Sequence, residues 1–241
     1  MTRHRVTPRV LVICGILGLG TVTRVGCSLD PGTRSIVQRT RSISNMKIIA
    51  MGLAHYHEVH GCLPPAIVKD KKGQPLYNWR VPACPFVGSE ELYKKYKLAE
   101  PWDSALNRAV SDAAPSVYRS PRSEAGPQAA SYVVAIGPNT PWPADRSCTI
   151  PAKAAWHTVV LVEVVQWTKP WASPADPNVD DLVARLAKDE GKEVDVLLAF
   201  ASGHVCALKR VPDKATLKRL FSMDAEATVM SLRSSEILVE R

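Results

Sequence analysis

An amphipathic segment near the N-terminus, from Ser35 to about Glu58, most limits what this chain can fold into. Its apolar residues recur at steps of three and four, the spacing of one helix face: Met46, Ile49, Leu53 and His57, with Ile43 and Ala50 on the same side. Gly61 and the pair Pro64-Pro65 predict the end of this helix at about residue 60. A helix with one apolar face must bury that face against a second layer.

The second layer is predicted by strand-like segments in the later half of the chain. Residues 131–137 and 157–165 are rich in β-branched side chains, and residues 194–201 and 204–208 read as a hairpin around Ser202-Gly203. Both hairpin strands are apolar on both faces, so we expect them at the centre of the sheet. Short helices are expected at residues 90–97, 104–111, 178–188 and 214–221. The predicted fold class is α+β, with a long N-terminal helix packed on an antiparallel sheet and short inserted helices.

The net charge of +8 is not spread over the predicted folded body. Residues 1–47 contain eight lysines and arginines and a single acidic residue, Asp30, so they hold seven of the eight net charges. A nucleic-acid-binding face would need this excess on the folded body. Nucleic acid is therefore not an expected partner.

A basic and then apolar leader predicts export. Arg3, Arg5 and Arg9 precede the uncharged run Val10–Val22, which is shorter than the roughly 20 residues that span a membrane and suits a signal-peptide core. We interpret residues 1–28 as a signal peptide or a membrane anchor. The expected location is the cell envelope, either anchored in the membrane or periplasmic, with the N-terminal segment as the membrane contact.

Processing of the leader is left open between three outcomes. The sequence Val25-Gly26-Cys27-Ser28 resembles the end of a lipoprotein signal, which would make Cys27 a lipidation site. Arg24 departs from that pattern, because an apolar residue is usual there. Ordinary cleavage and an uncleaved anchor are the alternatives.

Four further cysteines lie in the body of the chain: Cys62, Cys84, Cys148 and Cys206. They form no Cys-x-x-Cys pair, so zinc-ribbon spacing is absent. In an oxidising compartment they could pair in three ways. Buried thiols are an equally good interpretation.

Several short motifs, taken in order, resemble a pilin-like envelope family that is abundant in planctomycete bacteria, domain of unknown function 1559. The motifs are Asn45-Met46-Lys47, Gly52-Leu53, Tyr56-His57-Glu58, His60-Gly61, Leu63-Pro64-Pro65-Ala66, Trp79-Arg80-Val81, Leu92-Tyr93, Glu100 to Ser104 with Asn107, Val117-Tyr118-Arg119, Ser131-Tyr132-Val133, Gly137-Pro138, and Thr158 to Val164 with Glu163. The similarity covers about residues 42–221. It implies a pseudopilin-like body and an envelope location, and it implies no established biochemical activity.

Three departures from the family pattern bear on function. The prepilin leader of many members is absent. The late His-x9-Asp-Gly motif is degraded, with Lys192 and Ser202 at its His and Asp positions and only Gly203 retained. Two family cysteines fall on Ser42 and Ser120, which is the pattern that loss of a disulfide would leave.

One buried ion pair is predicted from the sequence. Glu163 interrupts an apolar strand, and a buried carboxylate without a partner would cost several kcal/mol. We expect a structural ion pair between Glu163 and Arg80.

No catalytic, cofactor or metal site is predicted. His55, His57 and His60 lack the spacing and acidic partners of a zinc site, and Ser202-Gly203-His204 reads as a turn. No cofactor is expected, and enzymatic activity is not expected.

The sequence supports two hypotheses for the function of the protein. The first is an exported, non-enzymatic, pilin-like protein that acts through protein contacts at the envelope. The alternative is a solute- or glycan-binding module that uses Trp142, Trp167 and Trp171, which lie in Pro-rich loops. Residues 35–60 and 61–221 would form one domain, and residues 222–241 would form a loosely attached C-terminal tail.

Overall fold

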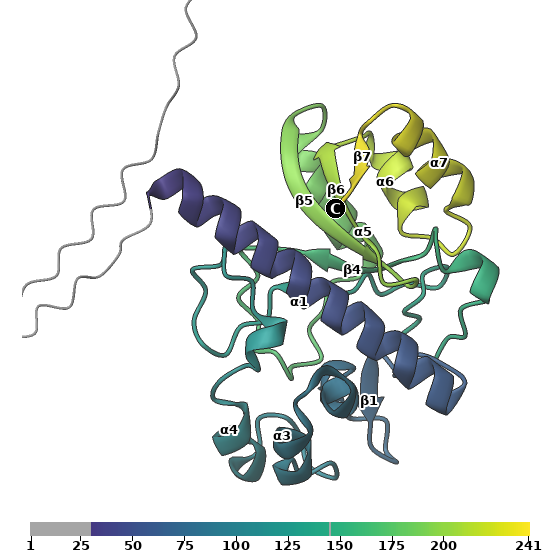
Figure 1. Ribbon diagram of the computed structural model, residues 1–241. Coiled ribbons are helices and arrows are strands. Elements are labelled where there is room, and N and C mark those ends of the chain that lie inside the picture. Colours follow the sequence, from purple (N-terminus) through teal and green to yellow (C-terminus); the bar gives the residue numbers. More distant parts are fainter. Residues whose placement is uncertain (1–29, 145) are drawn as a thin grey trace, which may run out of the picture.

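The structure, a computed structural model, describes residues 30–144 and 146–241 (Figure 1). Its first element is the long helix α1 (Pro31–His60), which crosses the whole body of the molecule. Asp30 caps the helix by accepting a hydrogen bond from the Thr33 amide at 3.0 Å. Gly61 ends it at φ +74°, a left-handed conformation that favours glycine. None of the helices in residues 30–144 and 146–241 is long and apolar enough to cross a membrane.

Gly52 allows α1 to approach the segment that follows α2. A Cβ atom at this position would lie 2.7 Å from Val87 Cγ1 and 2.8 Å from the Phe86 carbonyl oxygen. Gly52→Ala should therefore lower the free energy of unfolding by about 1–3 kcal/mol in urea titrations, although alanine has the higher helix propensity. Gly126→Ala is the matched control, because no atom lies within 4 Å of its added Cβ. Equal stability of the two variants would contradict the steric reason.

The central sheet has five antiparallel strands in the order β3-β4-β5-β6-β7. Their bounds are β3 (Tyr132–Val133), β4 (Val159–Glu163), β5 (Glu193–Phe200), β6 (Val205–Arg210) and β7 (Leu238–Glu240). The long β5 is the middle strand and β6 lies between β5 and β7, which confirms the central position expected for the hairpin. The hairpin loop has three residues, 201–203, because the Phe200 amide donates to the His204 carbonyl, and Gly203 has φ +89°.

Both faces of the sheet are covered, so the body has three layers. Leu197 and Ala199 of β5 face the core that contains Met46, Ile49 and Leu53 of α1. Their neighbours Leu198 and Phe200 face a second core. That second core is covered by α5 (Val179–Leu186), α6 (Lys214–Leu220) and α7 (Glu226–Ser234). This arrangement confirms the α+β fold class and the packing of the first helix on the sheet.

An insertion between α1 and the sheet holds a two-stranded sheet and three short helices. The elements are β1 (Ile67–Lys69), β2 (Pro75–Asn78), α2 (Arg80–Ala83), α3 (Glu90–Lys95) and α4 (Ala105–Ser111), with single 3-10 turns at Cys84–Val87 and Ser116–Tyr118. Two further 3-10 turns lie outside the insertion, at Ala152–Ala154 before β4 and at Ala187–Asp189 before β5. Ser104 caps α4 by accepting a hydrogen bond from the Asn107 amide, and the Ser89 side chain makes no capping bond to α3.

The expectation of a loose C-terminal tail is wrong. Residues 226–234 form α7, and residues 238–240 form β7, which pairs with β6 and completes the sheet. Val229, Leu232 and Leu238 are buried in the second core. These residues therefore contribute to the same domain as the rest of the body.

Candidate functional site

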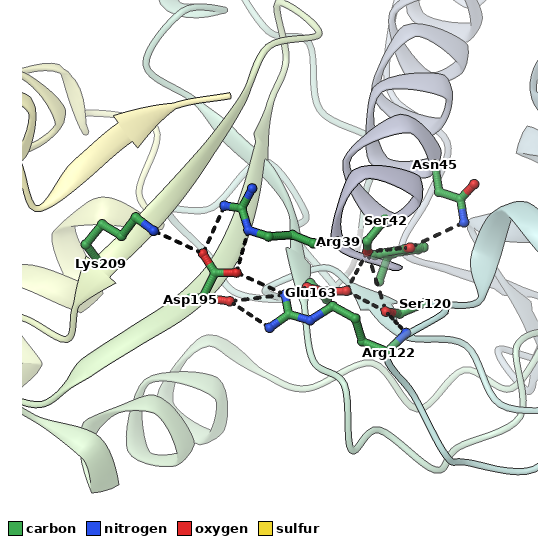
Figure 2. Close-up of polar contacts among 9 residues, drawn as sticks. Arg39, Ser42, Asn45, Ser120, Arg122, Glu163, Asp195 and Lys209 are labelled. Atoms are coloured by element: carbon green, nitrogen blue, oxygen red, sulfur yellow. Dashed lines mark hydrogen bonds and ion pairs between the residues drawn. The ribbon is translucent and has the colours of Figure 1, made fainter. Parts of the chain in front are cut away.

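The main buried polar feature of the described residues is a cluster around Glu163 at the end of β4 (Figure 2). One carboxylate oxygen of Glu163 accepts hydrogen bonds from Ser42 Oγ of α1 at 2.5 Å and from Ser120 Oγ at 2.6 Å. The other oxygen accepts from the Arg122 guanidinium at 2.8 Å. The Glu163 side chain is 1% exposed, so these partners replace the water it has lost.

Tyr132 continues this cluster toward the Asn45 side chain. Its hydroxyl lies 2.8 Å from Ser42 Oγ, and because Ser42 donates its own proton to Glu163, Tyr132 is the donor in this contact. Burial raises the pKa of Tyr132 to about 12, so the phenol keeps the proton that it donates. The Asn45 amide donates to the Arg119 carbonyl at 3.1 Å and to the Tyr132 hydroxyl at 3.4 Å. Every polar group around Glu163 therefore has a hydrogen-bond partner.

Ser42 and Ser120 are the two positions at which the family resemblance would place cysteines. Their Oγ atoms lie 3.5 Å apart, one on α1 and one on the segment after Tyr118. Two cysteines at these positions would have their side chains in contact, as a disulfide needs. In this chain, α1 and the body are tied together by two hydroxyl groups that share one carboxylate.

A second carboxylate extends the cluster to the surface. Asp195 of β5 accepts two hydrogen bonds from the Arg39 guanidinium of α1, at 2.7 and 2.9 Å. Its carboxylate also lies 3.5 Å from Arg122 and 3.4 Å from Lys209 of β6. Partial burial opposes the charged form, but the bonds from Arg39, together with the charges of Arg39, Arg122 and Lys209, outweigh it and lower the pKa of the Asp195 carboxyl.

The cluster joins α1 to segments that are distant from it in sequence. Arg39, Ser42 and Asn45 lie along one side of α1, while their partners come from β3, β4, β5 and the segment 119–122. Ser42 and Glu163 are buried, so a substrate has no access to either group. The arrangement is suited to fixing the angle of α1 on the sheet.

The predicted pair between Arg80 and Glu163 is wrong. Arg80 instead donates to both carboxylate oxygens of Asp176, at 2.8 and 3.0 Å, and to the Tyr132 carbonyl at 2.6 Å. Tyr132 and Glu163 are register partners in β3 and β4, but the Glu163 side chain turns to α1, where Arg122 and the two serines meet it. The prediction that a buried carboxylate needs a cationic partner holds, with Arg122 in place of Arg80.

The predicted tryptophan surface is not formed. Trp142 and Trp171 are 1% and 0% exposed and belong to the core under α1, where Trp142 packs against Trp79 at 5.3 Å between ring centroids. Trp167 is half-buried beside the second core. Pro-rich flanks indicated loops correctly, but these loops fold inward over the sheet. The exposed tryptophan of the described residues is Trp156, at 55%.

His204 sits directly after the hairpin turn, between two aromatic rings. Its ring stacks on Phe200 at 4.3 Å and on Trp156 at 5.0 Å. Arg233 of α7 lies 2.7 Å from Nε2 and can only donate, so the proton of the neutral ring is on Nδ1, which lies 2.5 Å from Ser202 Oγ. A ring that donates to Ser202 cannot accept the serine proton at the same atom, so this pair is no activated nucleophile.

The position of His204 predicts a loss of stability in mild acid. Burial, followed by the charge of Arg233, lowers the pKa of His204 to about 4, against about 6.5 in the unfolded chain. The unfolded state therefore binds the proton first, and stability falls by about 2 kcal/mol as the pH falls from 6.5 to 4. Urea titrations across this range measure the slope.

His204→Gln is the comparison variant for this pH dependence, because glutamine keeps a neutral hydrogen-bonding side chain. Its stability should lose most of the slope between pH 6.5 and 4. An unchanged slope in His204→Gln would assign the acid sensitivity to other groups.

The histidines near the end of α1 have structural contacts. His57 Nε2 accepts a hydrogen bond from the Ile150 amide at 3.1 Å. His55 and His60 pack on the Phe86 ring. Within residues 30–144 and 146–241, no group of three or more His, Cys, Asp or Glu side chains is placed to hold a metal ion. Cys27 and the leader lie outside the described residues.

Several residues of these clusters were not identified from the sequence. Asp176, Arg122 and Asp195 give no periodic signal, since the first two lie in Pro- and Ser-rich segments and the third lies near the start of a strand. Ser42 and Ser120 did give a signal, because the family resemblance pairs them. To connect this pair of serines with Glu163, the register of β4 would also have been needed.

These observations define the class of the protein: an α+β domain whose long N-terminal helix is held on an antiparallel sheet by a buried polar cluster. The model of one family, described as a protein of unknown function (DUF1559), matches residues 38–160, and the chain belongs to this family. No curated protein matches the chain. No solved structure matches it either.

Proposed function

We propose that this DUF1559 protein is an exported envelope protein of pseudopilin-like form that acts through protein contacts rather than catalysis. The observation that carries the proposal is a line of apolar side chains on the solvent side of α1. Val37, Ile48, Met51 and Val59 are 46–65% exposed. At 100° per residue they fall within about 80° of one another on the helix.

This line lies opposite the buried face of α1, so the outer side of the helix carries apolar side chains among exposed polar ones such as Arg41, Ser44 and His55. A surface helix that packs on one core normally has a polar outer face. An exposed apolar line indicates a second contact surface, to be covered by another protein. The first turns of α1 are exposed and directly follow the basic and apolar leader, which supports an orientation that presents this line at the membrane surface.

Membrane fractionation and native electrophoresis test the proposal with the full chain. We expect the protein in the envelope fraction, in a complex larger than the monomer. Met51→Glu should dissociate that complex, and Met230→Glu on α7 should not. The control is matched, because Met51 and Met230 are 65% and 54% exposed and differ in the face they occupy. A cytoplasmic monomer, or a complex that survives Met51→Glu, would refute the proposal.

A further inference from the structure

We infer that Cys62 and Cys148 form a disulfide bond that ties the segment Cys148–Ile150 to the end of α1. The two segments already run side by side. The Leu63 amide donates to the Cys148 carbonyl at 2.8 Å, and Thr149 Oγ donates to the Gly61 carbonyl at 2.9 Å. The two cysteines are therefore adjacent to the same backbone contact.

The backbone geometry brings the two Cα atoms close to the range of a disulfide. The Cα atoms of Cys62 and Cys148 each lie about 2.4 Å from one end of the 2.8 Å Leu63–Cys148 hydrogen bond, which keeps them within about 7.6 Å of each other. Disulfide-linked residues have Cα separations of about 4.4–6.8 Å. A small shift of an exposed turn is enough to close the bond.

The two thiols are accessible and weakly held. Both residues are half-buried and unpaired. Cys62 Sγ has only a 3.7 Å contact with the His60 carbonyl, and Cys148 Sγ has a 3.5 Å contact with the carbonyl of its neighbour Thr149. Burial raises the pKa of Cys148, the charge of Arg146 lowers it, and the charge of a Cys62 thiolate raises it further.

The remaining two cysteines are separated by the sheet. Cys84 belongs to the core on the α1 side, and Cys206 belongs to the core on the other side. Burial raises the pKa of Cys84 to about 12, so its thiolate is scarce at neutral pH. Cys84 and Cys206 cannot reach each other across the sheet. The geometry therefore favours a single bridge, Cys62–Cys148, with Cys84 and Cys206 left as thiols.

The bond forms by two exchanges with a disulfide-bearing oxidant. The thiolate of one cysteine attacks the oxidant disulfide, which releases one oxidant thiolate and gives a mixed disulfide. The second cysteine then attacks the protein sulfur of that mixed disulfide, and the other oxidant thiolate leaves. Two protein thiols are oxidised, the oxidant is reduced to two thiols, and the two protons pass to those leaving groups.

The bridge would lie at the rim of an apolar cavity of about 260 Å³ between α1 and the sheet. Leu63 follows Cys62, Ile150 is two residues after Cys148, and both line this cavity together with Leu53, His57 and Val160. Closing the bond would fix this wall of the cavity. Formation of the bridge in the cell rests on the proposed export, because disulfides persist in oxidising compartments.

The test uses the full chain with Cys14→Ser and Cys27→Ser, equilibrated in oxidised or reduced glutathione, alkylated and digested. In oxidised glutathione we expect one cross-linked peptide pair containing Cys62 and Cys148, and alkylation of Cys84 and Cys206 only after denaturation. The oxidised form should melt roughly 10 °C higher than the reduced form, because the bridge closes a long loop.

Cys62→Ser and Cys148→Ser provide the controls. Each should abolish the cross-linked pair, expose the remaining thiol to alkylation and melt alike in both buffers. The inference is overturned if, after equilibration in the oxidising buffer, Cys62 and Cys148 are both still open to alkylation or carry glutathione. It is also overturned if Cys62 is linked to Cys84 or Cys206. This measurement needs no export, so its failure is distinguishable from failure of the proposed function.

Discussion

Replacing Asp176 by alanine is expected to lower the free energy of unfolding by about 3–5 kcal/mol, because it leaves the buried Arg80 guanidinium without its counter-charge. The side chains of Arg80 and Asp176 are each 2% exposed. Asp176 also accepts a hydrogen bond from Trp79 Nε1 at 2.7 Å, which the substitution removes. Denaturant titration of the full chain measures the loss.

Asp180→Ala is the matched control for this effect. Asp180 pairs with Lys218 at 2.7 Å, but both side chains are at least 60% exposed. A surface pair of this kind contributes about 1 kcal/mol or less. If the two aspartate variants lost the same stability, burial of the Arg80 pair would not be the cause.

Glu163→Ala should lower the free energy of unfolding by about 3 kcal/mol. The substitution leaves the buried hydroxyls of Ser42 and Ser120 without an acceptor. Arg122 loses its partner too, but it is 26% exposed and retains contacts with Asp195, so its cost is smaller than that of a fully buried cation.

Glu163→Gln separates the hydroxyl contacts from the ion pair. Glutamine keeps a carbonyl oxygen for the two serines and loses the charge that faces Arg122. We expect a loss of about 1–2 kcal/mol, between the wild type and Glu163→Ala. A glutamine variant as unstable as the alanine variant would mean that the charge dominates and that the serine contacts contribute little.

The elements with a clear residue period were predictable from the sequence. The apolar stripe of residues 43–57 indicated α1, and the two-sided apolar hairpin indicated the central strands β5 and β6. β7 was missed because three residues give too short a pattern to distinguish from a loop. Only the register with β6 shows that Leu238 is in the core.

The sequence predicted that a buried carboxylate would have a cationic partner, but it did not predict which residue that partner would be. The position of Glu163 within an apolar strand required a cation, and one is present. Arg122 and Asp176 provide the true partners from irregular segments, whose paths depend on tertiary packing and have no local signal. The tryptophans were misplaced for the same reason, since Pro-rich sequence indicates a loop without telling whether the loop turns toward solvent or the core.

The contact between Arg39 and Asp195 can form only late in the synthesis of the chain. These residues are 156 positions apart, so α1 leaves the ribosome long before the strand that holds it. At roughly 5–20 residues per second, the helix waits about 10–30 s for its partner. Its apolar face, which holds Met46, Ile49 and Leu53, is uncovered throughout this interval. The native fold can therefore be completed only after nearly the whole chain has emerged from the ribosome.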